Sequence, residues 1–180
     1  YVENGLISGI DDFSRISACH PDAKVIEWDG QALLPGTVNA HNHSFQSLLR
    51  GLVTDRPFLE WRDQALYHYS PLLSAEDVYI GALFAFGEMM RYGVTTVCDF
   101  FYLHNEGLAS DEAIIQAAKD VGIRLALART MYDWDGAPQG YQETIDQAVK
   151  NTKKLAVKYQ GDPWVKIIPA PHSLHAASPE

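Results

Sequence analysis

The sequence predicts an α/β protein built around a parallel sheet. Strand-like segments rich in apolar and β-branched residues alternate with helix-like segments, and each helix-like segment ends at a glycine. In addition, a histidine follows directly after two of the strand-like segments. On this pattern alone, a doubly wound sheet and half of a (β/α)₈ barrel fit equally well.

The predicted elements follow in order from residue 33. Strands are expected at 33–40, 94–98, 123–128 and 164–170. Ser74 and Asp77 resemble the capping box of a helix that ends near Arg91. Ser110 or Asp111 is expected to cap a second helix ending at Gly122, and a third helix is expected at about 141–159.

Two shorter β-like segments precede these elements, at residues 1–10 and 24–34. They contain Asn4-Gly5 and Asp29-Gly30, which favour hairpin turns because both dipeptides tolerate positive φ. We therefore expect a small β-domain at residues 1–34 and the main domain at 35–180. Because the chain starts in a strand-like segment and ends in what resembles a helix start, we expect a piece of a longer protein.

Composition excludes several classes of function. The formal charge of −9 argues against nucleic-acid binding, which needs a positive surface. The most apolar run, Tyr79 to Met90, is interrupted by Glu88 and is too short to span a membrane. Two cysteines, Cys19 and Cys98, make no disulfide framework, so we expect a cytoplasmic protein. The sequence contains no nucleotide-binding glycine motif and no Gly-x-Ser-x-Gly.

The strongest functional motif is His41-x-His43, directly after the first strand of the main domain. Residues i and i+2 of a strand point to the same face, so the two imidazoles can share one divalent ion. Parallel α/β folds place their sites at this end of the strands. Two surface histidines in a loop are the alternative, which the preceding Leu33-Leu34-Pro35-Gly36 disfavours.

Other candidates are weaker. His172 also follows a strand, although an incidental histidine is equally compatible with its position. Asp99 could serve in acid–base chemistry but is better explained as a turn cap, and Arg62 could bind a carboxylate or simply pair with Asp63. Aromatic packing is the first explanation for Phe100-Phe101-Tyr102, and His68 and His104 fit structural or solvated positions.

Together, three motifs resemble the amidohydrolase superfamily: residues 33–43 its first strand, 93–97 its second and 170–173 its fourth. Within it, the chain is similar to the cytosine deaminase and S-adenosylhomocysteine deaminase branch, and most of all to formimidoylglutamate deiminases. The segments that carry this narrower resemblance are 43–46, 58–62, 101–104 and 171–174. The resemblance implies the N-terminal half of a (β/α)₈ TIM-type barrel, preceded by part of a small β-sandwich.

The resemblance also implies roles for particular residues. His41 and His43 would bind one divalent metal, with zinc expected and iron(II) as the alternative. Gln46, Arg62, Tyr102, His172 and His175 would contact a small-molecule substrate. The remaining ligands and the acid–base residues would lie beyond Glu180, so we expect the 180 residues alone to be inactive. Relatives are commonly dimers, which allows a homodimer here.

One departure affects the substrate. Formimidoylglutamate deiminases carry an arginine where this chain has His175, and a histidine is a weaker, pH-dependent carboxylate partner. The implied reaction is hydrolytic deamination of formimidoylglutamate or of an aminated heterocycle. Hydrolysis of a cyclic amide or a C–Cl bond, a non-catalytic binding relative, and a small α/β binding protein complete at 180 residues are the alternatives.

Overall fold

The computed structural model describes residues 1–179, in two compact units that divide between Pro35 and Gly36. The larger unit contains a four-stranded parallel sheet. Its strands are β3 (Thr37–Asn42), β4 (Val94–Phe101), β5 (Arg124–Met131) and β6 (Val165–Pro171). Among the described residues, no helix combines the length and the apolar character needed to cross a membrane.

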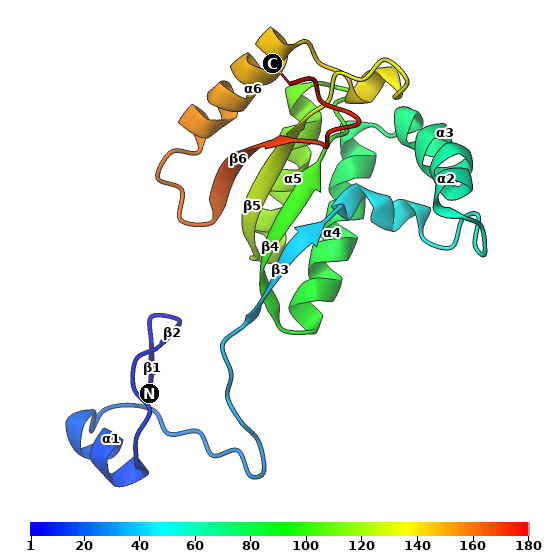
Figure 1. Ribbon diagram of the computed structural model, residues 1–180. Helices are drawn as coiled ribbons and strands as arrows, with labels where there is room; N and C mark the ends of the chain where they lie inside the picture. Colours follow the sequence, from blue (N-terminus) through cyan, green and yellow to red (C-terminus); the bar gives the residue numbers. More distant parts are fainter. Residues whose placement is uncertain (180) are drawn as a thin grey trace. The chain divides into compact units, whose positions relative to one another are not determined.

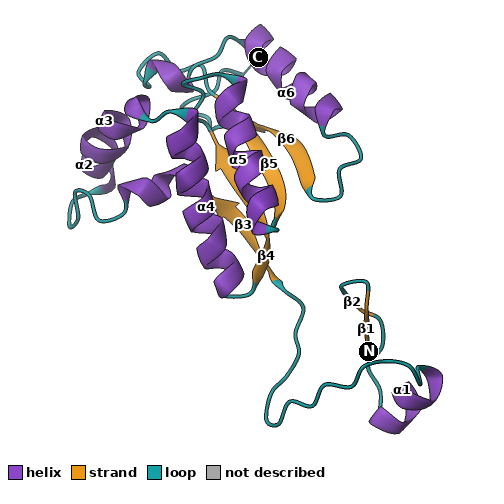
Figure 2. Ribbon diagram, turned by 180° about the vertical axis from the view of Figure 1, so that it is seen from behind, coloured by secondary structure: helices purple, strands orange, loops and turns teal. Residues whose placement is uncertain are grey.

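Three helices connect the successive strands: α4 (Ala75–Arg91), α5 (Leu108–Val121) and α6 (Ile145–Lys158). Helices α4 and α5 cover one face of the sheet, as Figures 1 and 2 show, and α6 packs against β5 and β6. Spatial order follows chain order, β3-β4-β5-β6, without the reversal that defines a doubly wound sheet. The order is that of consecutive strands in a barrel wall, which confirms the α/β prediction and favours the half-barrel.

The hydrophobic core lies between the sheet and its helices. Alternate strand residues face the helices, because side chains of a strand point to its two faces in turn. Fully or almost fully buried members of this core are Val97, Leu125, Leu127 and Val165 from the strands and Phe86, Ile114, Ile115 and Leu155 from the helices. The core therefore fixes the strand positions, and with them the residues that follow each strand end.

Glycine is required immediately before β3. A Cβ atom at Gly36 would lie 2.3 Å from Oγ1 of Thr95 on the neighbouring strand, closer than any real contact. The close approach lets the Thr37 amide donate to the carbonyl oxygen of Gly93, 2.9 Å away. Strand β3 thus begins at Thr37, four residues later than predicted, and it continues through His41.

The helix ends show where local signals sufficed. The Ser74–Asp77 capping box of α4 is present as predicted. In α5, however, the N-cap is Gly107, and the predicted caps Ser110 and Asp111 lie buried in its first turn. Helix α6 begins at Ile145, later than predicted, behind an unpredicted capping box of Thr144 and Gln147.

A chain of short helices separates β3 from α4. A 3₁₀ helix, Ser44–Leu49, follows β3 directly, and a longer helical stretch precedes α4. That stretch consists of α2 (Phe58–Trp61), a π-helical turn (Arg62–Leu66), α3 (Tyr67–Tyr69) and a 3₁₀ turn (Ser70–Leu72). These segments supply one side of the cavity described below.

The smaller unit has a hairpin and one helix. Strands β1 (Val2–Glu3) and β2 (Leu6–Ile7) pair antiparallel around the Asn4-Gly5 turn, as predicted. Helix α1 (Phe13–Cys19) was not predicted. Residues 24–34 form no strand, although the turn at Asp29-Gly30 is present with positive φ at Gly30. A strand needs a hydrogen-bonding neighbour, and none of the described residues pairs with this segment.

Candidate functional site

Two imidazoles converge at the carboxyl end of β3. Nε2 of His41 lies 3.1 Å from Nε2 of His43, so the shared face expected from strand periodicity is present. Two nitrogens that bind one tetrahedral zinc ion at about 2.0–2.1 Å lie about 3.3–3.4 Å apart. The observed spacing fits such a pair after a movement of a few tenths of an ångström.

The backbone of β4 sets the tautomer of His43. Its Nδ1 lies 2.7 Å from the carbonyl oxygen of Phe100, which can only accept, so Nδ1 carries the hydrogen. In the neutral ring, Nε2 then has a free lone pair that points towards His41. Burial lowers the pKa of His43, and this effect outweighs the hydrogen bond to Phe100, so the ring is neutral near pH 7. A neutral imidazole with a fixed tautomer suits a metal ligand.

Asp99, at the β4 residue beside Asn42, holds the turn that contains His43. Its carboxylate is fully buried and accepts hydrogen bonds from the Ser44 amide (2.8 Å), the Ser44 hydroxyl (2.6 Å) and the Asn42 amide group (2.9 Å). Burial raises the pKa of Asp99 to about 6, while the hydrogen bonds from Ser44 and Asn42 oppose that shift. Asp99 is therefore the turn cap that the sequence favoured. It binds the residues directly before and after His43, a candidate metal ligand.

A cavity of about 620 Å³ opens beside His43. Its size suits a small molecule. The walls are mainly aromatic and come from the short helices before α4 and from the ends of β4, β5 and β6. The aromatic lining residues are Phe58, Trp61, Tyr67, Tyr102, Tyr132, Trp134 and Tyr141. All five predicted substrate-contacting residues also line it: Gln46, Arg62, Tyr102, His172 and His175.

Three of these five residues lie together beside His43. The side-chain amide of Gln46 donates to the hydroxyl of Tyr102, which is almost fully buried. The ring of His172 packs against Tyr102 and Tyr132, with centroids 5.3 and 4.4 Å away. Burial lowers the pKa of His172 to about 4, so this imidazole is neutral near pH 7 and can donate or accept a hydrogen bond.

The two remaining residues, Arg62 and His175, line the cavity but are less well placed to bind a substrate. Arg62 places Nε 2.7 Å from Asp63 and its guanidinium over the ring of Tyr67, so it makes the local ion pair that the sequence left open. His175 is exposed, and its backbone amide donates to the Ser173 hydroxyl. A substrate carboxylate would have to compete with Asp63 for the guanidinium.

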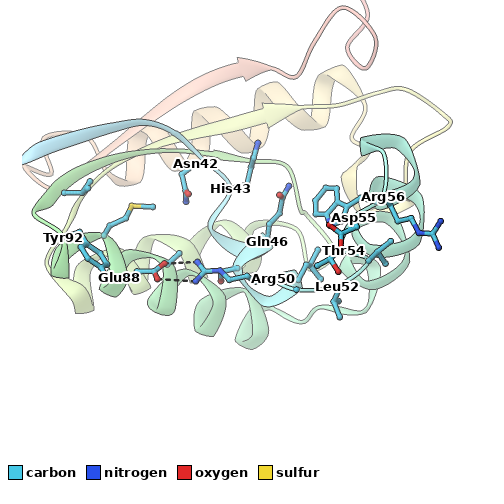
Figure 3. A pocket seen from close by; sticks show the side chains of 18 residues that line it. Asn42, His43, Gln46, Arg50, Leu52, Thr54, Asp55, Arg56, Glu88 and Tyr92 are labelled. Carbon is cyan, nitrogen blue, oxygen red and sulfur yellow. Dashed lines mark hydrogen bonds and ion pairs between the residues drawn. The ribbon is translucent and has the colours of Figure 1, made fainter.

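A second hollow, of about 680 Å³, is also lined by His43 and Gln46 (Figure 3). Arg50 and Glu88 face each other there in an ion pair of 2.8 Å, which Figure 3 marks with dashed lines. Both partners are partly exposed and neutralise each other, and two further charged residues, Asp55 and Arg56, also line this hollow.

Sequence reasoning missed some of the residues that line the cavity. Tyr132 and Tyr141 form much of the cavity wall, yet each follows a strand or precedes a helix without any motif. His68 is exposed and His104 is buried, in line with solvated and structural positions. Within residues 1–179, no three His, Cys, Asp or Glu side chains converge as a metal site, so His41 and His43 stand as a pair.

The sequence is similar to deaminases. It is 30% identical over 178 residues to 5-methylthioadenosine/S-adenosylhomocysteine deaminase of Syntrophobacter fumaroxidans, covering 99% of this chain and 38% of the relative. The corresponding deaminase of Carboxydothermus hydrogenoformans is 31% identical over 188 residues, with 99% and 40% covered. The chain thus spans about two fifths of the length of these curated relatives.

Solved structures agree with the fold. An adenosine deaminase of Xanthomonas campestris with bound zinc superposes with a TM-score of 0.65 at 26% identity, covering 76% of this chain and 29% of that one. Atrazine chlorohydrolase of Arthrobacter aurescens complexed with zinc gives a TM-score of 0.72 at 24% identity, with 81% and 36% covered. The model of the amidohydrolase family matches residues 32–180. The chain therefore belongs to the amidohydrolase family.

Proposed function

We propose that the protein containing this chain is a metal-dependent hydrolytic deaminase or deiminase. It would release ammonia from a C=N or amidine-type carbon of a small molecule. The observation that carries the proposal is the convergence of Nε2 of His41 and Nε2 of His43, 3.1 Å apart, beside an aromatic cavity. The similarity to deaminases over 99% of the chain supports the reaction class.

His41 and His43 would hold a zinc or iron(II) ion together with ligands from outside the described residues. When bound, such an ion supplies a water acidic enough to act as a nucleophile near neutral pH. The chain itself keeps His43 neutral through burial and fixes its hydrogen on Nδ1 through the Phe100 carbonyl. Both features leave Nε2 free to bind the ion.

The cavity residues would orient the substrate. His172, neutral near pH 7, offers a hydrogen bond at the cavity wall beside Tyr102 and Tyr132. The Gln46–Tyr102 pair presents a fixed amide and hydroxyl next to it. Because these polar groups are already in position before the substrate binds, they can hold its C=N group in one orientation.

Two substrate classes fit different parts of the cavity. The aromatic walls favour a planar aminated heterocycle, because stacked rings gain from burial and from their quadrupoles. Arg62 and His175 at the same cavity favour formimidoylglutamate, whose carboxylates need cationic partners. Since Arg62 is paired with Asp63 and His175 is exposed, the heterocycle is the first candidate.

The test is ammonia release by the whole zinc-loaded protein, with aminated heterocycles and N-formimidoyl-L-glutamate as substrates. We expect release from at least one, and loss of release in His41→Ala. His68→Ala is the matched control, because His68 is exposed and lies outside the cavity lining, and it should keep the activity. No ammonia from any substrate would reject the deaminase and favour hydrolysis of a cyclic amide or a C–Cl bond, or a non-catalytic role.

A further inference from the structure

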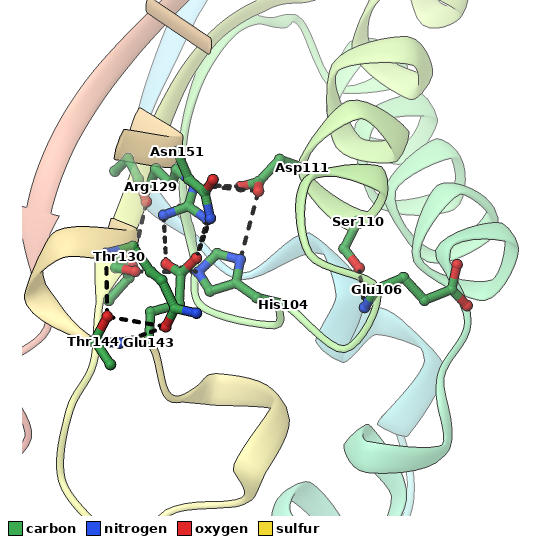
Figure 4. Close-up of polar contacts among 11 residues, drawn as sticks. His104, Glu106, Ser110, Asp111, Arg129, Thr130, Glu143, Thr144 and Asn151 are labelled. Atoms are coloured by element: carbon green, nitrogen blue, oxygen red, sulfur yellow. Dashed lines mark hydrogen bonds and ion pairs between the residues drawn. The ribbon is translucent and has the colours of Figure 1, made fainter. Parts of the chain in front are cut away.

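A buried cluster of charged side chains lies outside the cavity, among β5, α5 and the loops that follow β4 and β5 (Figure 4). Arg129 of β5 is at its centre, with no exposed surface. Its two terminal nitrogens donate to both carboxylate oxygens of Glu143, at 2.6 and 2.9 Å, and its Nε donates to Asp111 at 3.2 Å. One buried cation therefore faces two carboxyl groups.

His104 completes the cluster and places a second hydrogen-bond acceptor next to Asp111. Its Nε2 lies 3.2 Å from the carbonyl oxygen of Thr130, which can only accept, so Nε2 carries a hydrogen. In the neutral ring Nδ1 is then bare, and it lies 3.6 Å from Oδ2 of Asp111. Neither Nδ1 of His104 nor Oδ1 of Asp111 has a hydrogen-bond partner among the described residues. If Asp111 is ionised, two acceptors face each other in a buried space, which is costly.

We propose that His104 and Asp111 together hold one proton in the folded protein near neutral pH. With that proton, the pair is neutral overall, whichever residue carries it, and Arg129 balances Glu143. Without it, the cluster of four side chains would carry a net charge of −1, although three of the four side chains are buried. A proton between the two acceptors also allows their 3.6 Å contact to close to a hydrogen bond, after a movement of about half an ångström.

The surroundings place the proton on Asp111. Burial raises the pKa of Asp111 to about 7. The positive charge of Arg129 opposes this shift, and the negative charges of Glu143 and Glu112 add to it. Burial lowers the pKa of His104 to about 4, and the positive charge of Arg129 contributes to this shift. The negative charge of Glu143 and the hydrogen bond to the Thr130 carbonyl oppose it. Both shifts favour a protonated Asp111 that donates to a neutral His104.

The cluster fixes part of the cavity wall. His104 follows Tyr102 by two residues, and Glu143 follows Tyr141 by two; both tyrosines line the cavity, with ring centroids 5.0 Å apart. The His104 amide also donates to the carbonyl oxygen of Gly140 (2.7 Å). His104 and Asp111 are therefore positioning residues for this wall, whatever reaction the cavity serves.

The test compares wild type with Asp111→Asn in the whole protein, by denaturant unfolding between about pH 4.5 and 6.5. The variant amide keeps the shape, accepts from Arg129 and donates permanently to Nδ1 of His104. In this pH range the His104–Asp111 pair of the unfolded wild type binds one proton, on histidine. The folded pair also binds one, so the pair does not make the unfolding free energy of wild type depend on pH. The folded variant binds none, whereas its unfolded form binds one on histidine.

The ratio of the variant's folding equilibrium constant to that of wild type should therefore rise with pH, approaching about tenfold per pH unit. A flat ratio would overturn the proposal, because a wild-type pair without the proton would titrate as the variant does. Asp135→Asn is the matched control, an exposed aspartate that should give a flat ratio.

A measurement that keeps Asp111 remains decisive if Asp111→Asn fails to fold. Infrared spectroscopy with ¹³C-labelled aspartate near pH 6, in an Asp99→Asn background that removes the other buried carboxyl with a raised pKa, would detect a protonated Asp111, and ¹⁵N NMR would detect a doubly protonated His104 ring. Either signal supports the shared proton. A spectrum with neither signal contradicts it.

Discussion

The Asp99 carboxylate and the Ser44 hydroxyl lie 2.6 Å apart, and both are buried where β4 meets the turn after β3. Through this contact, a residue of the second barrel strand supports the turn that follows the first. His43 lies between Asn42 and Ser44, the two residues that Asp99 binds, so its position depends on Asp99 although the two side chains share no hydrogen bond within residues 1–179.

We therefore expect Asp99→Ala to weaken zinc binding by about 10–100-fold, the usual effect of losing a group that orients a ligand. Asp99→Asn should have a smaller effect, because its carbonyl oxygen still accepts from Ser44. Chelator competition on the whole protein measures the affinity, and Asp135→Ala serves as the exposed control. Unchanged affinity in Asp99→Ala would mean that the turn holds its shape without this carboxylate.

The hydroxyl of Tyr102 should matter for turnover. Tyr102→Phe leaves the Gln46 amide without its acceptor in a half-buried position, so kcat/KM should fall by about tenfold. Steady-state kinetics on the most active substrate gives the value. Tyr69→Phe, at an exposed tyrosine, should leave kcat/KM unchanged. Equal values for Tyr102→Phe and wild type would remove the Gln46–Tyr102 pair from the substrate site.

Local signals in the sequence predicted the elements that depend on neighbouring residues. The capping box of α4 needs only Ser74 and Asp77, three residues apart, and was predicted correctly. The convergence of His41 and His43 needs only the two-residue period of a strand. The lengths of β4 and β5 were underestimated, because parallel pairing between neighbouring strands continues to Phe101 and Met131.

Tertiary contacts explain the predictions that failed. Asp111 is of a residue type that often caps helices, yet it lies inside the first turn of α5. Its side chain binds Arg129, 18 residues away. His104, Arg129 and Glu143 come from three separate segments, and no spacing in the sequence connects them. The cavity wall has the same character, because Tyr132 and Tyr141 both pack against Tyr102, which lies after β4 in a distant part of the sequence.

Removing the buried cation should destabilise the fold strongly. Arg129→Met leaves Glu143 and Asp111 without their shared partner, and breaking a buried pair of this kind costs roughly 3–5 kcal/mol of unfolding free energy. Denaturant unfolding of the whole protein measures it. Lys158→Met breaks an exposed pair with Glu112 and should change stability little. Similar losses in the two variants would mean that Arg129 is solvated rather than buried.

The cap of α4 offers a test of a purely local contribution. Ser74→Ala removes the oxygen that accepts from the Asp77 amide and should cost about 1 kcal/mol, whereas Ser74→Gly should cost only about a few tenths. Hydrogen bonds from Ser74 lower the pKa of Asp77. A depressed folded pKa adds stability above the unfolded value of about 3.9 and loses it as pH falls through the folded value.

The advantage of wild type over Ser74→Ala should accordingly be constant at neutral pH and shrink below about pH 4. Unfolding free energies measured at neutral pH and at about pH 3 give the two values. An advantage that stays the same at both pH values would show that the Ser74 hydroxyl stabilises α4 through the Asp77 backbone amide alone, without contribution from the carboxylate.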